Sequence, residues 1–586
     1  MKFFLRKKSG FTLIETLIGS ALFIIIAIAI YQAYGNILEV IVKNQWRSDA
    51  VSVLNNEIEV VRGMAYDDVG IQGGYPSGKL LAQKTVSMDN NTFTVNTTVR
   101  SVDDPFDGTL GGYPNDTTPA DYKIVELEAI CNSCAGFGKV TIDTTVTPKG
   151  LENTTNNGAL FVNVFDANGS PVSDANVRVV NNSLNPAITI NDRTNNSGVL
   201  QLVDIPTSTM AYQVTVTKAG FSSDQTYALG DVSNPNPVKP NATVATQQIT
   251  SISFAIDKLS SMNTVTQNQY CSPIPNVTFG LSGTKLIGTN PDVLKYSQLF
   301  TSDSGGLQPI SSLEWDTYTV NNSDANYDIS GLIPLSPITI LPGTSNNLSM
   351  IMVSKKPSAL LVTVQDDAGN PINDASVQLI SGGFNQTLLT SRRQYSQKNW
   401  AGGNYYSQSG NVDTESVPNQ IELGKIGSDY ATSSEWLVSN TVDFGTQNTN
   451  FSDIEWSPTN QPAGTNLSFQ IATNNDNTTW NFFGPDGTAN SSYNTSGSAI
   501  NPLHNGNRYL RYKVFLNTSD PAITPALNSV AINFSSDCTP SGQAFFNGLN
   551  TGIYTLNVSK SGYQSFSNTN VPISSDWQEY KVKLLK

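Results

Sequence analysis

The length, composition and charge of the chain narrow the class of protein. With 586 residues it is long enough for several domains, and its formal net charge of −14 opposes binding to nucleic-acid phosphates. Charged residues make up 14% of the chain, against about 25% in an average soluble protein, and Asn, Thr, Ser and Gly are abundant. Such compositions are typical of extended extracellular β-modules, and we expect no nucleic-acid partner.

The first 33 residues combine a basic segment, one carboxylate and a long apolar run. Four basic residues precede Gly10, and residues 11–33 are almost entirely apolar except for Glu15. This run can span a hydrocarbon core about 30 Å thick, which needs roughly 20 residues. An ionised Glu inside a membrane helix costs several kcal/mol unless a partner neutralises it. Glu15 is therefore a candidate functional residue.

The segment GFTLIE (residues 10–15), with its basic leader and apolar run, resembles the N-terminal signal of bacterial type IV prepilins and pseudopilins. The resemblance implies that residues 1–10 are a leader peptide, that a prepilin peptidase cleaves between Gly10 and Phe11, and that the new amino group of Phe11 is methylated. It also implies that Glu15 neutralises the Phe11 ammonium of a neighbouring subunit during filament assembly. An ordinary signal peptide is the alternative, but residues 31–35 (YQAYG) fit a signal-peptidase site poorly.

A helix and a small sheet are predicted next. Apolar residues recur at helical spacing from Phe11 to about Arg62, and Gly63 can end the helix, whose transmembrane part would be residues 11–33. Segments 85–88, 92–99, 123–130 and 139–146 alternate apolar and polar residues, as half-buried antiparallel strands do. We therefore predict an α+β pilin-like domain, with residues 34–150 forming the rest of the helix and the sheet on which it packs.

Three carboxylates and four cysteines are candidate ligands or cross-links. Asp103, Asp104 and Asp107 lie in one loop, where they could bind calcium or form a solvated turn rich in Asp, Gly and Pro. Apart from calcium we expect no cofactor. Cys131 and Cys134 are a candidate local disulfide or half of a zinc site whose other ligands are missing. Cys271 and Cys538 are the second candidate disulfide.

An internal repeat follows a polar linker. Residues 160–179 (LFVNVFDANGSPVSDANVRV) and 360–379 (LLVTVQDDAGNPINDASVQL) align without a gap, each as a strand, a turn with Gly and Pro, and a second strand. Residues 212–221 (YQVTVTKAGF) match 554–563 (YTLNVSKSGY), but these segments are 342 positions apart, whereas the first pair is 200 positions apart. The later copy therefore has an insertion of roughly 140 residues, which indicates one domain inserted into a loop of another.

Both copies resemble the carboxypeptidase regulatory-like family of β-sandwiches. The resemblance implies Ig-like or prealbumin-like sandwiches at residues 158–258 and at 358–390 plus 536–586, which act as spacers and binding modules without a peptidase site. A degenerate copy is predicted at 264–355, and a jelly-roll-like sandwich is predicted as the insert at 391–535. The predicted fold class is thus α+β at the N-terminus followed by serial all-β sandwiches.

The sequence offers few candidates for catalysis. Its one histidine, His504, lies in a segment typical of a turn that enters a strand, and there is no Gly-rich phosphate loop, so we expect no enzyme. Trp456, Trp480 and Tyr493 of the insert are candidate sugar-binding aromatics, with a place in the core as the alternative.

These features together predict a minor type IV pilin-like subunit, at the tip or initiating a filament, that displays sandwiches for adhesion or surface binding. The alternatives are a type II secretion pseudopilin and a membrane-anchored carbohydrate-binding surface protein that never polymerises. Expected partners are prepilin peptidase, other pilins or pseudopilins, the inner membrane, and a surface glycan or protein ligand. We expect a single pass through the bacterial cytoplasmic membrane with the N-terminus inside, and a place in a cell-surface filament after processing.

Overall fold

The computed structural model describes residues 13–149, 156–574 and 576–586. The chain forms two compact units: residues 1–257 with 286–293, and residues 258–285 with 294–586.

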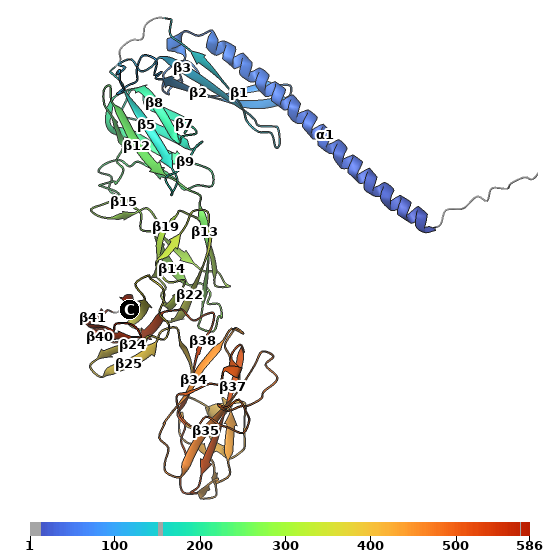
Figure 1. Cartoon of the computed structure of the whole chain (residues 1–586), viewed down its shortest axis with the longest axis vertical. Coiled ribbons are helices and arrows are strands. Elements are labelled where there is room, and N and C mark those ends of the chain that lie inside the picture. The colour runs from blue at the N-terminus through green and yellow to red at the C-terminus, as the bar shows by residue number, and fades with distance from the viewer. Residues whose placement is uncertain (1–12, 150–155, 575) are drawn as a thin grey trace, which may run out of the picture. The chain divides into compact units, whose positions relative to one another are not determined.

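The first unit begins with the long helix α1 (Leu13–Arg62), whose C-terminal part packs on a small sheet (Figure 1). Its buried apolar side chains begin at Ala50 and recur to Val61 at helical spacing. The sheet is antiparallel with strand order β1-β2-β3-β4. Its strands are β1 (Gln83–Met88), β2 (Asn91–Val102), β3 (Tyr122–Cys131) and β4 (Val140–Val146), and the short 3-10 helix η1 (Tyr66–Asp68) lies between α1 and β1. Alternate residues of β2, such as Phe93 and Val95, are buried and join the core shared with the helix.

The first unit also contains a β-sandwich. One sheet has the order β12-β5-β8, and the other has the order β10-β9-β6-β7 with β11 beside β9. Side chains of both sheets, including Leu160, Val177 and Val214, form one core. The strands are β5 (Gly158–Phe165), β6 (Asn176–Asn181), β7 (Ile188–Arg193), β8 (Val199–Ile205), β9 (Ser208–Thr217), β10 (Asp224–Gln225), β11 (Ala242–Val244) and β12 (Ile249–Ala255).

The second unit opens with another sandwich, built from sheets β18-β13-β22-β20 and β17-β14-β19-β21. Its strands are β13 (Ser260–Gln267), β14 (Thr278–Ser282), β17 (Ser297–Thr301), β18 (Leu307–Leu313), β19 (Asp316–Asn322), β20 (Tyr327–Ile333), β21 (Ile338–Ile340) and β22 (Ser345–Ser354). A separate two-stranded ladder is formed by β15 (Leu286–Gly288) and β16 (Val293–Leu294), most of which belongs to the first unit.

The last sandwich is assembled from two distant parts of the sequence. Its sheets are β39-β23-β42 and β25-β24-β40-β41. The strands are β23 (Ala359–Gln365), β24 (Ser376–Ser381), β25 (Phe384–Leu389), β39 (Gln543–Asn547), β40 (Gly552–Ser559), β41 (Phe566–Ile573) and β42 (Trp577–Lys583).

Between these two parts the chain forms a further sandwich with its own aromatic-rich core, which we call the inserted module (residues 391–535). Its main sheets are β26-β38-β34-β36 and β27-β32-β37-β33, with β35 also beside β37. The strands of these sheets are β26 (Arg393–Gln397), β27 (Ser407–Gln408), β32 (Glu435–Val438), β33 (Val442–Asp443), β34 (Asn450–Ser457), β35 (Thr465–Asn474), β36 (Ser498–Ala499), β37 (Tyr509–Thr518) and β38 (Ser529–Ser535). The smaller elements are η2 (Ala401–Gly403), β28 (Val412–Asp413), β29 (Glu422–Leu423), β30 (Lys425–Ile426), β31 (Asp429–Tyr430) and η3 (Pro502–His504).

Three of the sandwiches share one plan. In each, the first strand pairs in parallel with the last, as β5 does with β12, β13 with β22 and β23 with β42. In each, the first strand also ends in the same turn, closed by the backbone bridges Phe165–Pro171, Gln267–Pro273 and Gln365–Pro371. The predicted fold class, a long helix on a small sheet followed by serial β-sandwiches, is confirmed.

Candidate functional site

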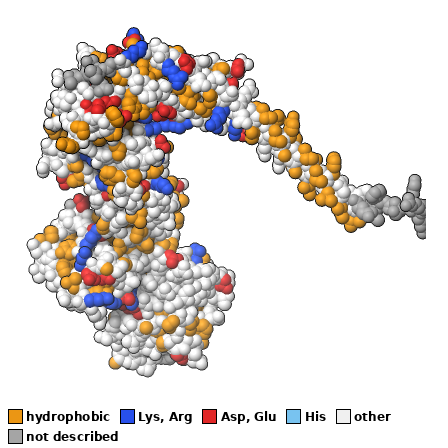
Figure 2. Space-filling view, turned by 45° about the horizontal axis from the view of Figure 1, so that its top comes forward, with side chains coloured by type: hydrophobic (Ala, Val, Ile, Leu, Met, Phe, Trp, Pro, Cys, Tyr) orange, Lys and Arg blue, Asp and Glu red, His pale blue; other side chains and the backbone are white. Residues whose placement is uncertain are grey.

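The N-terminal half of α1 presents apolar side chains that the rest of the chain leaves uncovered. Every large hydrophobic side chain from Leu13 to Val42 is exposed, from 82% at Leu13 to 40% at Val42. Figure 2 shows these orange side chains along the helix where it leaves the sheet. Burying a large apolar side chain releases about 1.5–3 kcal/mol, so this surface favours lipid or neighbouring helices over water.

The length of this apolar segment matches a membrane. Residues 16–38 contain no Asp, Glu, Lys or Arg, which corresponds to about 33 Å of helix at 1.5 Å per residue. The hydroxyls of Thr16 and Ser20 donate hydrogen bonds back to helix carbonyls, which lowers the cost of placing them in an apolar environment. The next charges along the helix are Glu39 and Lys43, which form an ion pair at 2.6 Å. Within the described residues, α1 is the one helix long and apolar enough to span a membrane.

The predicted processing residues, Gly10 and Phe11, lie outside the described residues. Glu15 lies in the first turns of α1, and its side chain is likewise outside the described part of the structure. Their roles in cleavage, methylation and assembly stay predictions.

The cysteines form two disulfides, Cys131–Cys134 and Cys271–Cys538. The first closes a short loop after β3. The second joins the turn after β13 to the chain segment between β38 and β39, and so cross-links the first sandwich of the second unit to the boundary of the inserted module. Tyr270, next to Cys271, stacks on Phe534 of the inserted module with 5.9 Å between ring centroids.

Two of the three Asp residues predicted as calcium ligands accept hydrogen bonds within their own loop, and the third, Asp107, is exposed. Asp103 accepts a hydrogen bond from the amide of Leu110 (2.9 Å), and Asp104 accepts one from the amide of Phe106 (3.1 Å). Burial and the neighbouring carboxylates raise the pKa of Asp103. Over the described residues, no three His, Cys, Asp or Glu side chains lie close enough together to hold a metal ion. Asp103 and Asp104 thus help to hold the turn, and calcium binding by Asp103, Asp104 and Asp107 stays a prediction.

Two of the three candidate sugar-binding aromatics are core residues. Trp456 is 5% exposed and packs on Phe469 with 4.5 Å between ring centroids, while Tyr493 is 1% exposed. The prediction that they bind sugar is wrong, because alternation along β34 turns Trp456 inward and Tyr493 packs into the same core. Trp480 is half-buried, and its ring lies 4.2 Å from the guanidinium carbon of Arg511.

His504 is fully buried in the inserted module. Its Nδ1 lies 3.0 Å from the hydroxyl of Thr473, and burial lowers its pKa to about 4. These contacts hold the ring in the interior between η3 and β35. This agrees with a structural role for a residue in a turn that leads into a strand.

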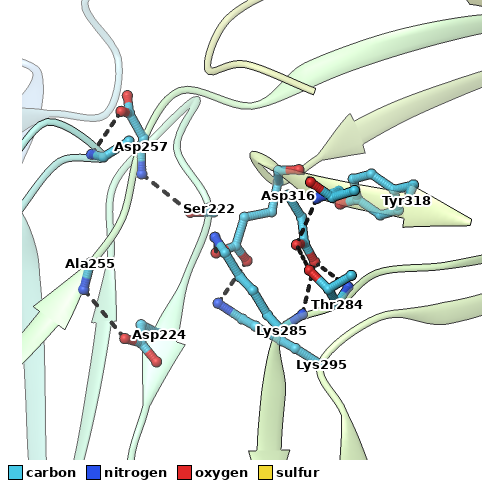
Figure 3. Close-up of polar contacts among 12 residues, drawn as sticks. Ser222, Asp224, Ala255, Asp257, Thr284, Lys285, Lys295, Asp316 and Tyr318 are labelled. Atoms are coloured by element: carbon cyan, nitrogen blue, oxygen red, sulfur yellow. Dashed lines mark hydrogen bonds and ion pairs between the residues drawn. The ribbon is translucent and has the colours of Figure 1, made fainter. Parts of the chain in front are cut away.

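Carboxylates near the sandwich ends organise turns (Figure 3). In the first unit, Asp257 accepts a hydrogen bond from the amide of Ala167 (3.0 Å), and its own amide donates to the hydroxyl of Ser222 (3.2 Å). In the second unit, Asp316 accepts hydrogen bonds from the amide and the hydroxyl of Thr284 (2.9 and 2.7 Å). These side chains are occupied in holding loops to strands.

In the first unit, an ion pair to a buried carboxylate ties the helix-bearing domain to its sandwich. Arg100 of β2 contacts both carboxylate oxygens of Asp192 in β7 at 2.5 Å, and also contacts Glu126 at 3.2 Å. The Asp192 side chain is 2% exposed. Removing Arg100 would leave a buried charge uncompensated, so the pair fixes this contact.

In the second unit, side chains of the last sandwich and of the inserted module cover the edge strand β20. Gln543 donates a hydrogen bond to the carbonyl of Leu332 (2.8 Å) and accepts one from its amide (3.0 Å). Trp577 and Arg393 donate to the carbonyls of Ile329 and Ser330. The free edge of a sheet is thereby satisfied by a neighbouring module.

Sequence reasoning missed Arg100, Gln543 and a pair of buried threonines. Thr194 and Thr390 each bridge the same two backbone groups of their sandwiches: they accept from the amides of Ala175 and Ala375, and donate to carbonyls just upstream. The gapless repeat pairs residues that are 200 positions apart, but these threonines are 196 positions apart. The difference arises because the β24–β25 hairpin of the later copy is shorter than the β6–β7 hairpin of the first. Arg100 and Gln543 have partners far away in the sequence and carry no local signal.

Comparison with known proteins supports the N-terminal signal. A model described as the prokaryotic N-terminal methylation motif matches residues 5–31. No curated protein matches the sequence significantly.

Among solved structures, the Bacillus anthracis TIE protein is 11% identical, and the alignment covers 86% of this chain and 73% of that one with a TM-score of 0.16. GBS52, the minor pilin of Streptococcus agalactiae, is 13% identical over 34% of this chain and 99% of that one, with a TM-score of 0.17. The shaft pilin SpaA of Lactobacillus rhamnosus GG is 11% identical over 34% and 98%, with a TM-score of 0.14. Because scores this low do not establish a common fold, the functional inference rests on the motif and the helix.

Proposed function

We propose that this protein is a minor type IV pilin-like subunit, with a structural rather than a catalytic role, anchored by α1 and displaying its β-sandwiches outside the cell. The observation that supports it most is that the methylation motif at residues 5–31 overlaps a helix whose large apolar side chains from Leu13 to Val42 have no cover within the described chain. Lipid would cover this surface before assembly, and neighbouring helices would cover it in a filament.

The proposed processing is cleavage between Gly10 and Phe11 by a prepilin peptidase, followed by methylation of Phe11. Glu15 then neutralises the Phe11 ammonium of the adjacent subunit, which gives an intramembrane carboxylate the partner it requires. The sandwiches that follow residue 150 would crowd a shaft if every subunit carried them. A tip or initiating position therefore suits the chain better than that of a major subunit.

The role of Glu15 can be tested with Glu15→Ala and a matched variant on the same helix, Glu39→Ala. Glu39 already has an exposed ion pair with Lys43, so its loss costs little. We expect Glu15→Ala to remain in the membrane fraction and Glu39→Ala to enter sheared filaments as the wild type does. Incorporation of Glu15→Ala at the wild-type level would instead favour a membrane anchor that never polymerises.

A further inference from the structure

One sheet face of the inserted module carries aromatic rings interleaved with two cations. Arg511, Lys513 and Phe515 alternate along the central strand β37, while the residues between them enter the core. Trp436 lies directly opposite Phe515 on the neighbouring strand β32. Residues from two adjacent strands thus place rings and cations on one surface.

Arg511 is held between two rings. Its guanidinium carbon lies 3.7 Å from the ring centroid of Tyr406 and 4.2 Å from that of Trp480, and its Nε donates to the hydroxyl of Thr441 at 2.9 Å. Tyr406 itself is 61% exposed, whereas the Arg511 side chain is largely covered, with 9% of the residue exposed. A guanidinium fixed in this way loses little conformational freedom when it binds a ligand.

Lys513 has a similar setting. Its Nζ lies 4.5 Å from the ring centroid of Trp436 and 4.9 Å from that of Phe515, and partial burial lowers its pKa. Unlike Arg508, which lies just before β37 and forms an ion pair with Asp443 at 2.7 Å, neither Lys513 nor Arg511 forms an ion pair with a described residue. Two cations without a carboxylate stand out in a chain of net charge −14.

We propose that this ring–cation face binds a saccharide that carries a carboxylate. The face consists of Tyr406, Trp436, Trp480, Arg511, Lys513 and Phe515. The rings supply flat apolar surface for the C–H side of a sugar, and the cations supply donors for its carboxylate. The inference rests on the proposed function, because display outside the cell is what brings such a ligand within reach.

Charge favours an acidic sugar over a nucleic acid. Single strands also bind to combinations of rings and cations, but their affinity depends on neutralising many phosphates. Two cations on a strongly acidic protein can neutralise few phosphates, but they are enough to pair with the single carboxylate of one sugar unit.

The test uses the full-length chain in detergent and isothermal titration calorimetry. The probes are trigalacturonic acid and sialyllactose, each with its uncharged counterpart, the methyl ester of trigalacturonic acid and lactose. We expect at least one acid to bind and its counterpart to bind about tenfold more weakly or worse, the effect of one charged hydrogen bond. Lys513→Gln should lose affinity by a similar factor. Arg508→Gln, which changes a cation that is already paired, should stay within about twofold of the wild type.

Several results would overturn the inference: no binding of either acid, equal binding of the uncharged counterparts, unchanged affinity in Lys513→Gln, or displacement of the acid by a single-stranded oligothymidylate at lower concentration. Thermal unfolding of Lys513→Gln, whose side chain lies outside the core, checks that the variant is folded. If the acids fail to bind while the chain still enters filaments, this inference alone falls. If binding is intact but the chain never enters filaments, the proposed function falls instead.

Discussion

Cys271 occupies a backbone position where the related turns have glycine. In the turns after β5 and β23, Gly169 and Gly369 donate their amides to Asp166 and Asp366 with φ of 81° and 86°. In the turn after β13, Cys271 makes the equivalent hydrogen bond to Asn268 with φ of 57°. A residue with a side chain costs about 1 kcal/mol or more in this left-handed region. The disulfide to Cys538 accounts for the use of cysteine here.

Because Cys271 combines a strained backbone with a disulfide, its loss and the loss of Cys538 should change the stability by different amounts. Cys271→Gly and Cys538→Ala both remove the disulfide, which costs about 2–5 kcal/mol, but only Cys271→Gly also removes the strained residue. We expect Cys271→Gly to be more stable than Cys538→Ala by about 1 kcal/mol, and less stable than the wild type, in denaturation without reductant. With reductant, Cys271→Gly should become more stable than the wild type. An order in which Cys538→Ala exceeds Cys271→Gly would contradict this account of the turn.

The buried His504 predicts a loss of stability in mild acid. The unfolded chain takes up a proton below pH 6.5, but the folded chain takes it up only below about pH 4, where burial has placed the pKa of this histidine. The free energy of unfolding therefore falls as the pH drops between these values, by roughly 2 to 3 kcal/mol at pH 4.5.

Comparison with His504→Gln isolates this contribution from that of the carboxylates. Urea denaturation at pH 7 and pH 4.5 should show a wild-type loss that exceeds the loss in His504→Gln by that amount. Equal losses in the two proteins would show that the folded state tolerates a charged His504.

At the level of elements, the covering of the β20 edge makes a specific prediction. Gln543 is 1% exposed, and Gln543→Leu would leave the amide and carbonyl of Leu332 without these hydrogen bonds. Because a buried unpaired polar group costs about 1–3 kcal/mol, the variant should lose about 2–4 kcal/mol of unfolding free energy. Gln378→Leu, at a half-buried position of β24, should change stability by about 0.5 kcal/mol or less. Similar values for the two variants in chemical denaturation would count against an edge-covering role of Gln543.

The elements that the sequence predicts well are those with a local signal. The helix ends at Arg62 because its apolar period stops before Gly63, and strands β2 and β3 follow the alternation of residues 92–99 and 123–130. The turns of the repeat were visible because Asp, Gly and Pro recur in the same order. The split sheet β39-β23-β42 follows from the two different offsets between the copies. The exact domain boundaries stay a prediction.

What the sequence could not predict depends on partners far away along the chain. Trp456 was a candidate platform because ring type alone does not tell which face of a strand is buried, and only the packing of β34 against Phe469 decides it. The sequence does not predict the ring–cation face for the same reason. Tyr406, Trp480 and Arg511 meet only after strands β27, β32, β37 and β35 have paired. Contacts of this kind need the register, which a single sequence leaves open.

At the scale of the whole molecule, the chain combines one uncovered apolar helix segment with a series of polar sandwiches. Three of the sandwiches reuse one plan of a parallel first and last strand, and turns at the sandwich ends are held by Asp side chains and, at Cys271, by a disulfide. The helix alone leaves a large apolar surface without cover in the described chain. This division favours an anchor-and-display protein, in which assembly depends on the N-terminus and binding depends on the modules.

The most direct test of this account is mass spectrometry of the mature N-terminus of protein recovered from sheared filaments and from membranes. The account predicts a chain that begins at Phe11 with a methylated amino group and is present in the filament fraction. An intact Met1, or a chain that begins near Ala33, would contradict it and leave a β-sandwich surface protein without a pilin role.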